Sequence, residues 1–484
     1  MAGHDDRTGG SGGLYVRRAD IFPRAIDGFY RRLKWAIMAV TLTIYYVTPW
    51  LRWDRGAYAP DQAVLVDLAN RRFYFFDIEI WPHEFYYVAG LLVMAGVGLF
   101  LVTSTVGRAW CGYACPQTVW TDLFLHIERA IDGDRNAQIR LRAAPLSAGK
   151  IAKRVLKHGI WLLIALLTGG AWVFYFADAP TLARDLLTGD AAVVAYSTVA
   201  VLAFTTYVLG GWMREQVCIY MCPWPRIQSA MLDERSLIVT YKDWRGEPRS
   251  RGMKKDAGAP TGDCVDCGAC AAVCPTGIDI RDGAQFECIT CALCIDACDD
   301  VMARIGRPRG LIDYATLEDC KAEAAGAPPV SIARTMLRPR TLLYFALWGV
   351  IGLAMMFALG NRTRMDLSVA HDRNPLWVQL SDGAIRNAYT IKLRNMESRP
   401  RDFVLTLDGL ADGAMWESLG NEAESARTLR FSVAPDSVDQ RRIYVRAGAD
   451  GGAAEPFAFT LSAADGAHET DKAETRFDRP GDQP

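Results

Sequence analysis

Eight of the 13 cysteines fall into two tightly spaced runs that share one pattern. The first run, ending at Cys274, reads C-x2-C-x2-C-x3-C and is followed by Pro275, and the second repeats it with Asp299 in the proline position. Loops with this spacing wrap cubane [4Fe-4S] clusters, and the fourth cysteine of each run ligates the other cluster. The sequence therefore predicts one cluster on Cys264, Cys267, Cys270 and Cys298 and a second on Cys288, Cys291, Cys294 and Cys274.

Structural zinc is the main alternative for these cysteines, because four-cysteine zinc sites are also built from C-x2-C pairs. Zinc sites usually separate two such pairs by a longer loop, whereas three cysteines at successive two-residue gaps and a fourth after three residues fit the corners of a cube. Covalent haem attachment is excluded, since no C-x-x-C-H run occurs. We therefore expect two adjacent clusters that carry electrons.

Two further cysteine pairs share the pattern C-x3-C-P, each just past the inner end of an apolar segment. A four-residue step places both thiols of a pair on one face of a helix, and the proline disturbs the turn that follows. Thiolates and thioethers select Cu(I) among biological metals. The pairs thus predict a catalytic copper site made by Cys111, Cys115, Cys218 and Cys222 with Met221. The alternative is that these thiols only pack in the protein interior.

Three other residues with metal-binding side chains receive simpler interpretations. His126 and His158 flank the inner ends of membrane segments, where they could ligate metal or take a proton from a quinol. Packed polar histidines are the preferred interpretation. Cys320 has no partner nearby in the sequence and is predicted to be structural.

The pairs and runs are positioned by apolar segments long enough to cross a membrane. Four segments qualify directly: Phe85–Val106, Gly159–Phe176, Ala192–Met213 and Thr341–Gly360. A fifth, Trp35–Trp50, is shorter and contains Pro49, but aromatic residues at both ends suit the two membrane interfaces. With five spans, residues 35–213 form a four-span region and residues 341–360 the last span.

Lys and Arg predict the orientation, because cytoplasmic loops retain positive charge. Basic residues crowd before the first span and between the second and third, whereas the next connection has only Arg184 against three Asp. The loop from Leu51 to Glu84 opposes this pattern with four Arg. We expect a cytoplasmic N-terminal segment, 1–34, a cytoplasmic insert, 214–340, and a C-terminal region outside.

The C-terminal region alternates apolar and polar residues in five segments, 389–395, 403–409, 427–435, 441–448 and 455–463. This period is typical of strands, and turn-rich separators favour a small all-β sandwich over residues 361–463. Residues 464–484 are polar and are predicted to be a disordered tail. Over the whole chain, 54 basic residues balance 55 acidic ones, which argues against nucleic acid as a partner.

With these motifs in view, the sequence resembles the FixG/CcoG/RdxA family of polyferredoxin-like membrane proteins that accompany assembly of the cbb-type cytochrome c oxidase. The resemblance covers nearly the whole chain and rests on GRAWCGYACPQTVWTDLF (107–124), REQVCIYMCPWPRIQSAMLDERSLIVTY (214–241), the stretch 244–299 and RNPLWVQLSDGAIRNAYTIKL (373–393). It implies location in the bacterial cytoplasmic membrane and a periplasmic immunoglobulin-like domain. It also implies reduction of Cu(II) to Cu(I) for the oxidase.

The expected fold class is therefore a multidomain membrane protein with a helical bundle of about five spans, a two-cluster ferredoxin-like insert and an all-β immunoglobulin-like domain. Expected partners are copper ions, membrane lipid, a quinol or other electron donor, and a copper chaperone or oxidase assembly factors. A quinol-dehydrogenase-like conduit to another redox protein is the alternative function. A non-redox assembly scaffold is a third.

Overall fold

The structure, a computed structural model, describes residues 20–56, 59–250, 261–328, 337–397, 399–420, 422–464 and 469–480. Its contacts divide the chain into two compact units. We call them the membrane–insert unit, Met1–Leu51 with Val64–Leu353, and the C-terminal unit, Arg52–Ala63 with Ala354–Pro484. Most of the predicted cytoplasmic N-terminal segment, residues 1–19, lies outside the described residues.

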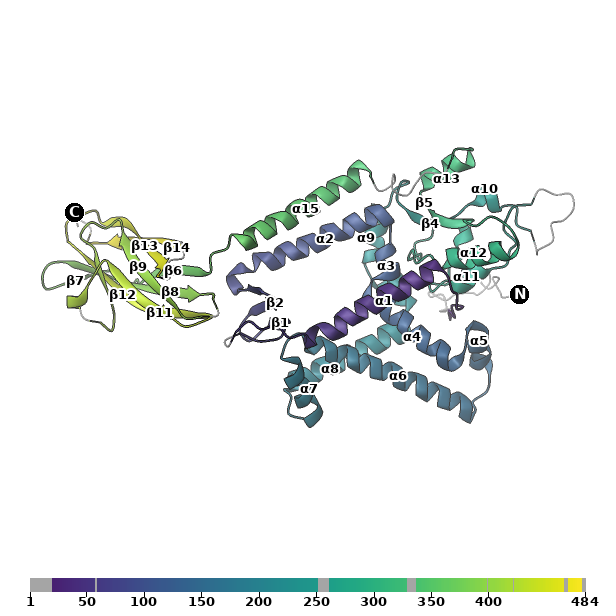
Figure 1. Cartoon of the computed structure of the whole chain (residues 1–484), viewed down its shortest axis with the longest axis horizontal. Coiled ribbons are helices and arrows are strands. Elements are labelled where there is room, and N and C mark those ends of the chain that lie inside the picture. Colours follow the sequence, from purple (N-terminus) through teal and green to yellow (C-terminus); the bar gives the residue numbers. More distant parts are fainter. Residues whose placement is uncertain are drawn as a thin grey trace, which may run out of the picture. The chain divides into compact units, whose positions relative to one another are not determined.

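Four helices are long and apolar enough to cross a membrane, as the sequence predicts (Figure 1). Their apolar side chains face outward, for example Leu92, Val194 and Leu353, which is the arrangement expected of helices that contact lipid. The helices are α2 (Tyr86–Val106), α6 (Ala148–Val173), α8 (Val193–Thr206) with its π-helical continuation η3 (Tyr207–Met213), and α15 (Pro339–Gly360).

The fifth predicted span is a helix, α1 (Phe29–Val47), but it is not among those four. Basic residues occupy its first two turns, and it ends at Val47, before the 3-10 turn η1 (Thr48–Trp50) that contains Pro49. A membrane crossing by α1 therefore stays a prediction. Asp296 of the insert accepts hydrogen bonds from the backbone N–H groups of Tyr30 and Arg31, which fixes the start of α1 to the insert.

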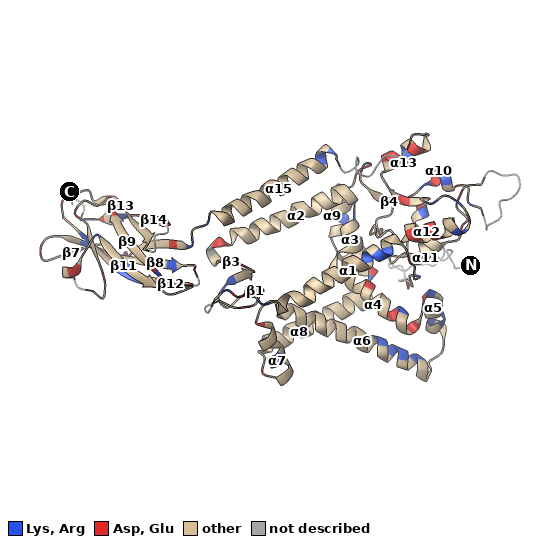
Figure 2. Ribbon diagram, viewed as in Figure 1, with Lys and Arg blue, Asp and Glu red and all other residues tan. Residues whose placement is uncertain are grey.

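Helix α6 begins at Ala148 instead of the predicted Gly159, because its first turns are amphipathic. Lys150 donates a 3.0 Å hydrogen bond to the carbonyl of Arg142, and Lys157 pairs with Glu128 and Asp132. Figure 2 shows that the basic residues of α1 and α6 gather at the helix ends nearest α11 (Ala269–Val273) and α12 (Leu293–Arg304) of the insert.

Short elements connect these helices. The stretch predicted as a loop from Leu51 to Glu84 contains an antiparallel sheet in the order β1-β2-β3, followed by the 3-10 turn η2 (Pro82–Glu84). The strands are β1 (Val64–Asp67), β2 (Arg72–Phe75) and β3 (Ile78–Ile80). The connecting helices are α3 (Ala109–Tyr113), α4 (Pro116–Asp132), α5 (Arg135–Ala143), α7 (Ala179–Thr188) and α9 (Trp224–Met231).

The insert is closed by an antiparallel pair of strands, β4 (Ile238–Tyr241) and β5 (Ile312–Ala315). Its buried core joins this pair to the cysteine loops through Val239, Ile280, Ile295 and Met302. The helical elements are α10 (Asp243–Gly246), α11 (Ala269–Val273), η5 (Ile280–Asp282), α12 (Leu293–Arg304) and α13 (Leu317–Ala324).

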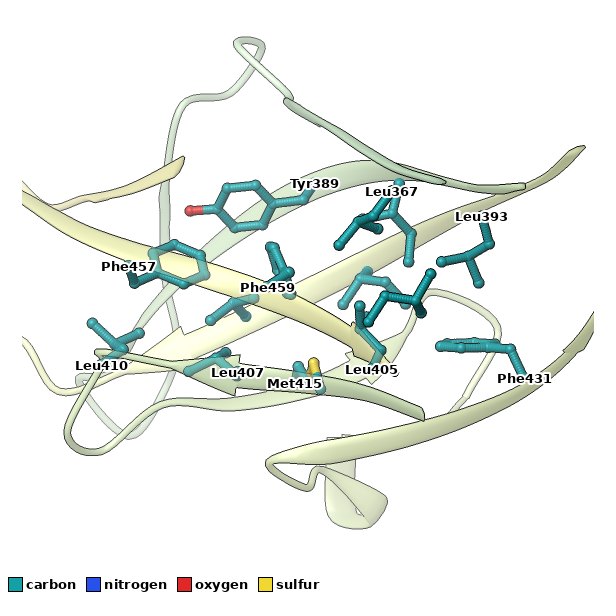
Figure 3. Packing of buried hydrophobic residues seen from close by; sticks show 14 of the residues in the cluster. Leu367, Tyr389, Leu393, Leu405, Leu407, Leu410, Met415, Phe431, Phe457 and Phe459 are labelled. Carbon is teal, nitrogen blue, oxygen red and sulfur yellow. The ribbon is translucent and has the colours of Figure 1, made fainter. Parts of the chain in front are cut away.

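The C-terminal unit is a β-sandwich, and all five predicted strand segments are strands. One sheet has the order β10-β12-β8-β6 with β7 paired to β8, and the other has the order β11-β9-β13-β14. Figure 3 shows inward-facing residues such as Tyr389, Leu405 and Phe459 filling the space between the sheets. The strands are β6 (Met365–His371), β7 (Val378–Gln379), β8 (Ile385–Asn395), β9 (Arg401–Asp408), β10 (Ala414–Glu417), β11 (Thr428–Val433), β12 (Ser437–Ala447), β13 (Ala454–Ala463) and β14 (Thr470–Asp478).

The prediction of a disordered tail after residue 463 was wrong for residues 470–478. They form β14, which pairs with β13 along its length. The segment is polar because β14 is an edge strand, and Phe477 at its end is fully buried in the core. Residues 465–468 and 481–484 lie outside the described residues.

Candidate functional site: two cysteine cavities and the C-x3-C-P turns

The eight cysteines of the two runs line two neighbouring cavities, grouped as the crossover pattern predicts. Cys264, Cys267, Cys270 and Cys298 line the first cavity. Cys274, Cys288, Cys291 and Cys294 line the second. Cys270 also borders the second cavity, so one side chain separates the two. We refer to them as cavity 1 and cavity 2; their ligand roles remain a prediction.

The two cavities are wrapped by one backbone shape used twice. Asp266 and Thr290, at the same position of each repeat, have φ values of 51° and 58°. Gly268 and Ala292, the next matched pair, have φ values of 63° and 60° and begin α11 and α12. A β-branched residue at positive φ is strained and persists where the surroundings enforce it. The strain at Thr290 is therefore set by the curvature of the loop around cavity 2.

The chemistry of the lining fits an iron-sulfur cluster. Burial raises the pKa of Cys270, Cys291 and Cys298 to about 12, so thiolates at these positions need a bound cation to offset their burial. The backbone N–H groups of Ala271 and Leu293 lower the pKa of Cys270 and Cys291 in part. Hydrogen bonds to sulfur are one way that proteins tune cluster potentials. A cluster held here supplies one-electron transfer.

Each C-x3-C-P pair lies at a break between helices, so the prediction that both thiols share one helical face was wrong. Cys111 lies in α3 while Cys115 caps α4, and Cys218 lies in the π-helical turn η4 (Val217–Met221) that ends before Cys222. The cause is a wide turn in both pairs, each followed by proline. The N–H of Cys115 donates to the carbonyl of Trp110, and that of Cys222 to Val217, both five residues back.

The chain enters the two turns in the same way. Gly107 and Arg214, each four residues before the first cysteine, end their membrane helices with φ values of 60° and 46°. Arg214 tolerates this conformation with its guanidinium fixed by Glu128 at 2.7 Å and by the carbonyl of Gly211. We call Gly107–Pro116 turn A and Arg214–Pro223 turn B; they are two copies of one local structure.

Turn A lies directly against the wall of cavity 2. A Cβ atom at Gly112 would lie 2.7 Å from the carbonyl oxygen of Ile289 and 2.9 Å from the Cα of Cys291, so only glycine fits. The Tyr113 hydroxyl donates a 3.2 Å hydrogen bond to the Cys291 carbonyl. Cys111 belongs to the same buried cluster as Ile289 and Cys291. Turn A therefore packs against the backbone of a predicted cluster ligand through Gly112 and Tyr113.

The four turn thiols lie within electrostatic reach of one another. The Cys218 thiol is influenced by Cys115, Cys111 and Cys222, and burial is the largest cause that raises its pKa to about 12. Cys111 donates a 3.0 Å hydrogen bond to Gln228 of α9, the helix that follows turn B. Among the described residues, no three His, Cys, Asp or Glu side chains are arranged to hold a single metal ion. The four thiols are gathered but do not form a closed coordination shell.

The remaining predicted residues are not part of this cluster. Met221 is 55% exposed beside Cys222. His126 packs edge-on against Trp35, and His158 contacts Tyr207 at 2.9 Å, so both are packed polar histidines. Cys320 is buried in α13, as expected of a structural cysteine.

Sequence reasoning missed Arg108, which it assigned only to the basic inner side of the membrane. Arg108 is buried, and its guanidinium donates to the carbonyl of Phe286 in the loop before Cys288. It is also the nearest cation to the Cys111 thiol, whose pKa burial raises to about 11 and Arg108 lowers in part. The sequence feature that could have assigned Arg108 to the site is its position three residues before Cys111.

Comparison with known proteins agrees with this arrangement. A family model described as a 4Fe-4S dicluster domain matches residues 213–317, and one described as a 4Fe-4S binding domain matches residues 88–132. A third, the IG-like fold at the C-terminus of FixG, matches residues 355–480. The nitrogen fixation protein FixG of Rhizobium meliloti is 56% identical over 97% of this chain and 94% of its own length.

The chain belongs to the FixG/RdxA family. Protein RdxA of Cereibacter sphaeroides is 57% identical over 90% of both chains, and protein RdxB of the same organism is 56% identical over 91% and 92%. Membership with the iron-sulfur domains makes the chain an iron-sulfur electron-transfer protein of the membrane. The C-terminal sandwich is the immunoglobulin-like domain of FixG.

Proposed function

We propose that this FixG/RdxA-family protein reduces Cu(II) to Cu(I) at turns A and B with electrons delivered through cavities 1 and 2. The observation that carries the proposal is the contact of turn A with the Cys291 backbone, in one buried cluster with Cys111 and with the other three turn thiols in reach. The path is continuous: Cys270 borders both cavities, and turn A touches the wall of cavity 2.

The reaction is a one-electron transfer for each copper ion. A one-electron reductant loses an electron, and the Cu(II) substrate gains it and becomes Cu(I). Thiols suit the product better than the substrate, because soft sulfur ligands prefer Cu(I). Turn B offers the outlet, since Tyr220 and Met221 on it are 70% and 55% exposed.

The proposed setting is the bacterial cytoplasmic membrane, with the insert in the cytoplasm and the C-terminal domain in the periplasm. The basic ends of α1 and α6 near the insert support this orientation. The Cu(I) product would serve assembly of a cbb-type cytochrome c oxidase, handed to a copper chaperone or an assembly factor.

The test uses the full chain purified without oxygen in detergent. Cu(II) is added to the dithionite-reduced, desalted protein while cluster absorbance is followed and Cu(I) is trapped with a colorimetric chelator. Reoxidation with stoichiometric Cu(I) is expected from a protein containing about eight irons, the content of two cubane clusters. Clusters that stay reduced in the presence of Cu(II) would refute copper reduction.

A second candidate is a quinol-dehydrogenase-like conduit, and one pocket favours it. Polar and charged residues from α1, α4 and turn B line a pocket that shares Thr276 and Ile289 with cavity 2. Buried Lys34 and Asp122 and the thiol of Cys218 are among them. Cluster reduction by a short-chain quinol, abolished by Thr121→Trp in this pocket, would support this candidate.

An iron-sulfur cluster competes with copper as the group that the four turn thiols would bind. The 4Fe-4S binding family model covers residues 88–132 and thus includes Cys111 and Cys115. Four gathered cysteines from two matched turns are also the donor set of a cubane cluster. About 12 irons per chain, falling to about eight in Cys218→Ala, would assign a third cluster to the turns in place of copper.

A further inference from the structure

Arg108 occupies the junction between cavity 2 and the turn thiols. Its side chain is buried, and its charge acts on Cys111 of turn A, on Cys218 of turn B and on Cys288 of cavity 2. Its Nη1 donates to the carbonyl of Phe286, whereas its Nε is buried without a hydrogen-bond partner among the described atoms. No carboxylate pairs with Arg108 in the described part of the chain. It is a buried, uncompensated positive charge.

Lys34 places a second positive charge beside cavity 2. Its side chain is 3% exposed, it lines a pocket that shares Thr276 and Ile289 with cavity 2, and its charge acts on the thiol of Cys291. The closest carboxylate, Asp122, is 3.8 Å away and already receives two 2.9 Å hydrogen bonds from Arg31. Arg31, Lys34 and Asp122 together therefore keep one net positive charge.

The other charged groups facing this side do not cancel that charge. Arg214 and Glu215 line the same pocket as Lys34 with opposite signs. The carboxylate oxygens of Asp296 accept the backbone N–H groups of Tyr30 and Arg31, so this charge is directed at the start of α1. The side of cavity 2 that faces the membrane helices remains positive.

Cavity 1 has the opposite balance. Its nearest cation, Arg281, is held by Asp279 at 2.6 Å and by Asp266 at 2.6 Å. Asp299 adds a third carboxylate beside Cys298. Cys267 of this cavity is exposed, whereas none of the four cysteines that line cavity 2 is exposed. Cavity 1 thus combines a negative surrounding with access to solvent.

We propose that Arg108 and Lys34 make cavity 2 the higher-potential centre, so that electrons enter at cavity 1 near Cys267 and run through cavity 2 to turn A. A nearby cation favours the more negative, reduced form of a cluster, and a low-dielectric surrounding strengthens this effect. Arg108 and Lys34 are positioning residues: they set the direction of flow. The inference depends on the proposed function only where it takes copper at the turns as the final electron acceptor.

The experiment is a redox titration of the full chain in detergent, followed by electron paramagnetic resonance, with no copper present. Two reduction steps are expected. Arg108→Gln and Lys34→Gln should each lower the reduction potential of the higher step. The expected shift is at least 59 mV, which corresponds to a tenfold change in the equilibrium constant of a one-electron reduction. The lower step should stay in place, and the iron content should remain at about eight per chain.

Two matched variants separate charge from packing. Arg108→Lys keeps the charge and should restore most of the wild-type potential. Arg281→Gln removes the equivalent cation from cavity 1 and should lower only the lower step. The proposal is overturned if Arg108→Gln and Lys34→Gln leave both steps unchanged, shift both equally, or act on the lower step.

A measurement on Cys267→Ala keeps the proposal testable if the charge variants lose iron. This variant lacks a cavity 1 ligand and should retain one cluster, which should titrate near the higher of the two wild-type potentials. Titration near the lower potential would refute the proposed order. Because copper is absent, a failed copper assay and a failed titration are separate results.

Discussion

Turns A and B share one backbone conformation but lie in different environments. Both follow a membrane helix through a residue at positive φ, both close with a hydrogen bond from the second cysteine five residues back, and both end in proline. Yet position 108 is a buried arginine in turn A where turn B has Glu215, and turn A is covered by the cavity 2 loops while Tyr220 of turn B is exposed. Under the proposed function, this difference corresponds to a division of labour in which turn A receives electrons and turn B meets the copper substrate.

The largest effect is expected where turn A touches cavity 2. Gly112→Val would push a side chain against Ile289 and Cys291 and displace turn A with its thiols. Copper reduction should slow about 100-fold, because a displacement near 1 Å of groups that position a substrate can cost that much. Stopped-flow absorbance of the reduced clusters after Cu(II) addition measures it. Ile219→Val, at the matched position of turn B, is the control and should change the rate little.

Next in size is the loss of a turn thiol. Cys218→Ala and Cys222→Ala should keep both cluster signals and lower copper reduction at least about tenfold, the scale expected when a metal contact is removed. The measurement is the amount of Cu(I) trapped by the chelator for each electron that the clusters lose. Equal rates in wild type and Cys222→Ala would remove turn B from the copper site and leave the comparison of the turns without a functional meaning.

Substitutions of Gly107 and Arg214, the residues at positive φ that begin turns A and B, should differ in their effect on thermal stability. Gly107→Ala places a Cβ atom at positive φ against the carbonyl of Leu237, with a cost of about 1–2 kcal/mol for the backbone alone. Arg214→Ala keeps a side chain at the same conformation and loses the pair with Glu128. Thermal unfolding in detergent should therefore show the larger drop in midpoint for Gly107→Ala; the reverse order would contradict the tight approach at Leu237.

The smallest expected effect distinguishes two tyrosines at the same position of the turns. Tyr113→Phe removes a buried hydrogen bond to the Cys291 carbonyl and should cost about 1 kcal/mol of unfolding free energy. Tyr220→Phe removes a hydroxyl from a side chain that is 70% exposed and should change nothing measurable. Chemical denaturation monitored by cluster absorbance tests both. Equal losses would mean that the two turns are equally buried in solution.

The sequence predicted most of what depends on local spacing. The cysteine runs gave the grouping of both cavities, because cluster loops need sulfurs at fixed intervals, and apolar length gave four membrane helices. Alternation found β8, β9, β11, β12 and β13 but missed β6, β7, β10 and β14. Two to four residues, as in β7 and β10, are too few to show a period, and an edge strand such as β14 needs few apolar residues, so Phe477 stands almost alone in it.

What the sequence could not supply is contact between distant segments. Gly112 reads as one glycine among many until the Cys291 backbone lies against it. Lys34 and Arg108 look like ordinary basic residues near a membrane, and only the fold brings them to cavity 2. The wide turns also escaped prediction, because C-x3-C spacing fits an α-helical face equally well.

The exchange of cysteines between the two repeats has a consequence for biogenesis. Cavity 2 is complete in the growing chain only at Cys294, and cavity 1 only at Cys298, one helical turn later on α12. A nascent chain that stops between the repeats offers three thiols for one cluster and one for the other. If the cysteines hold clusters as predicted, neither cluster can be completed before the second repeat has been synthesised, so iron delivery must follow synthesis of α12.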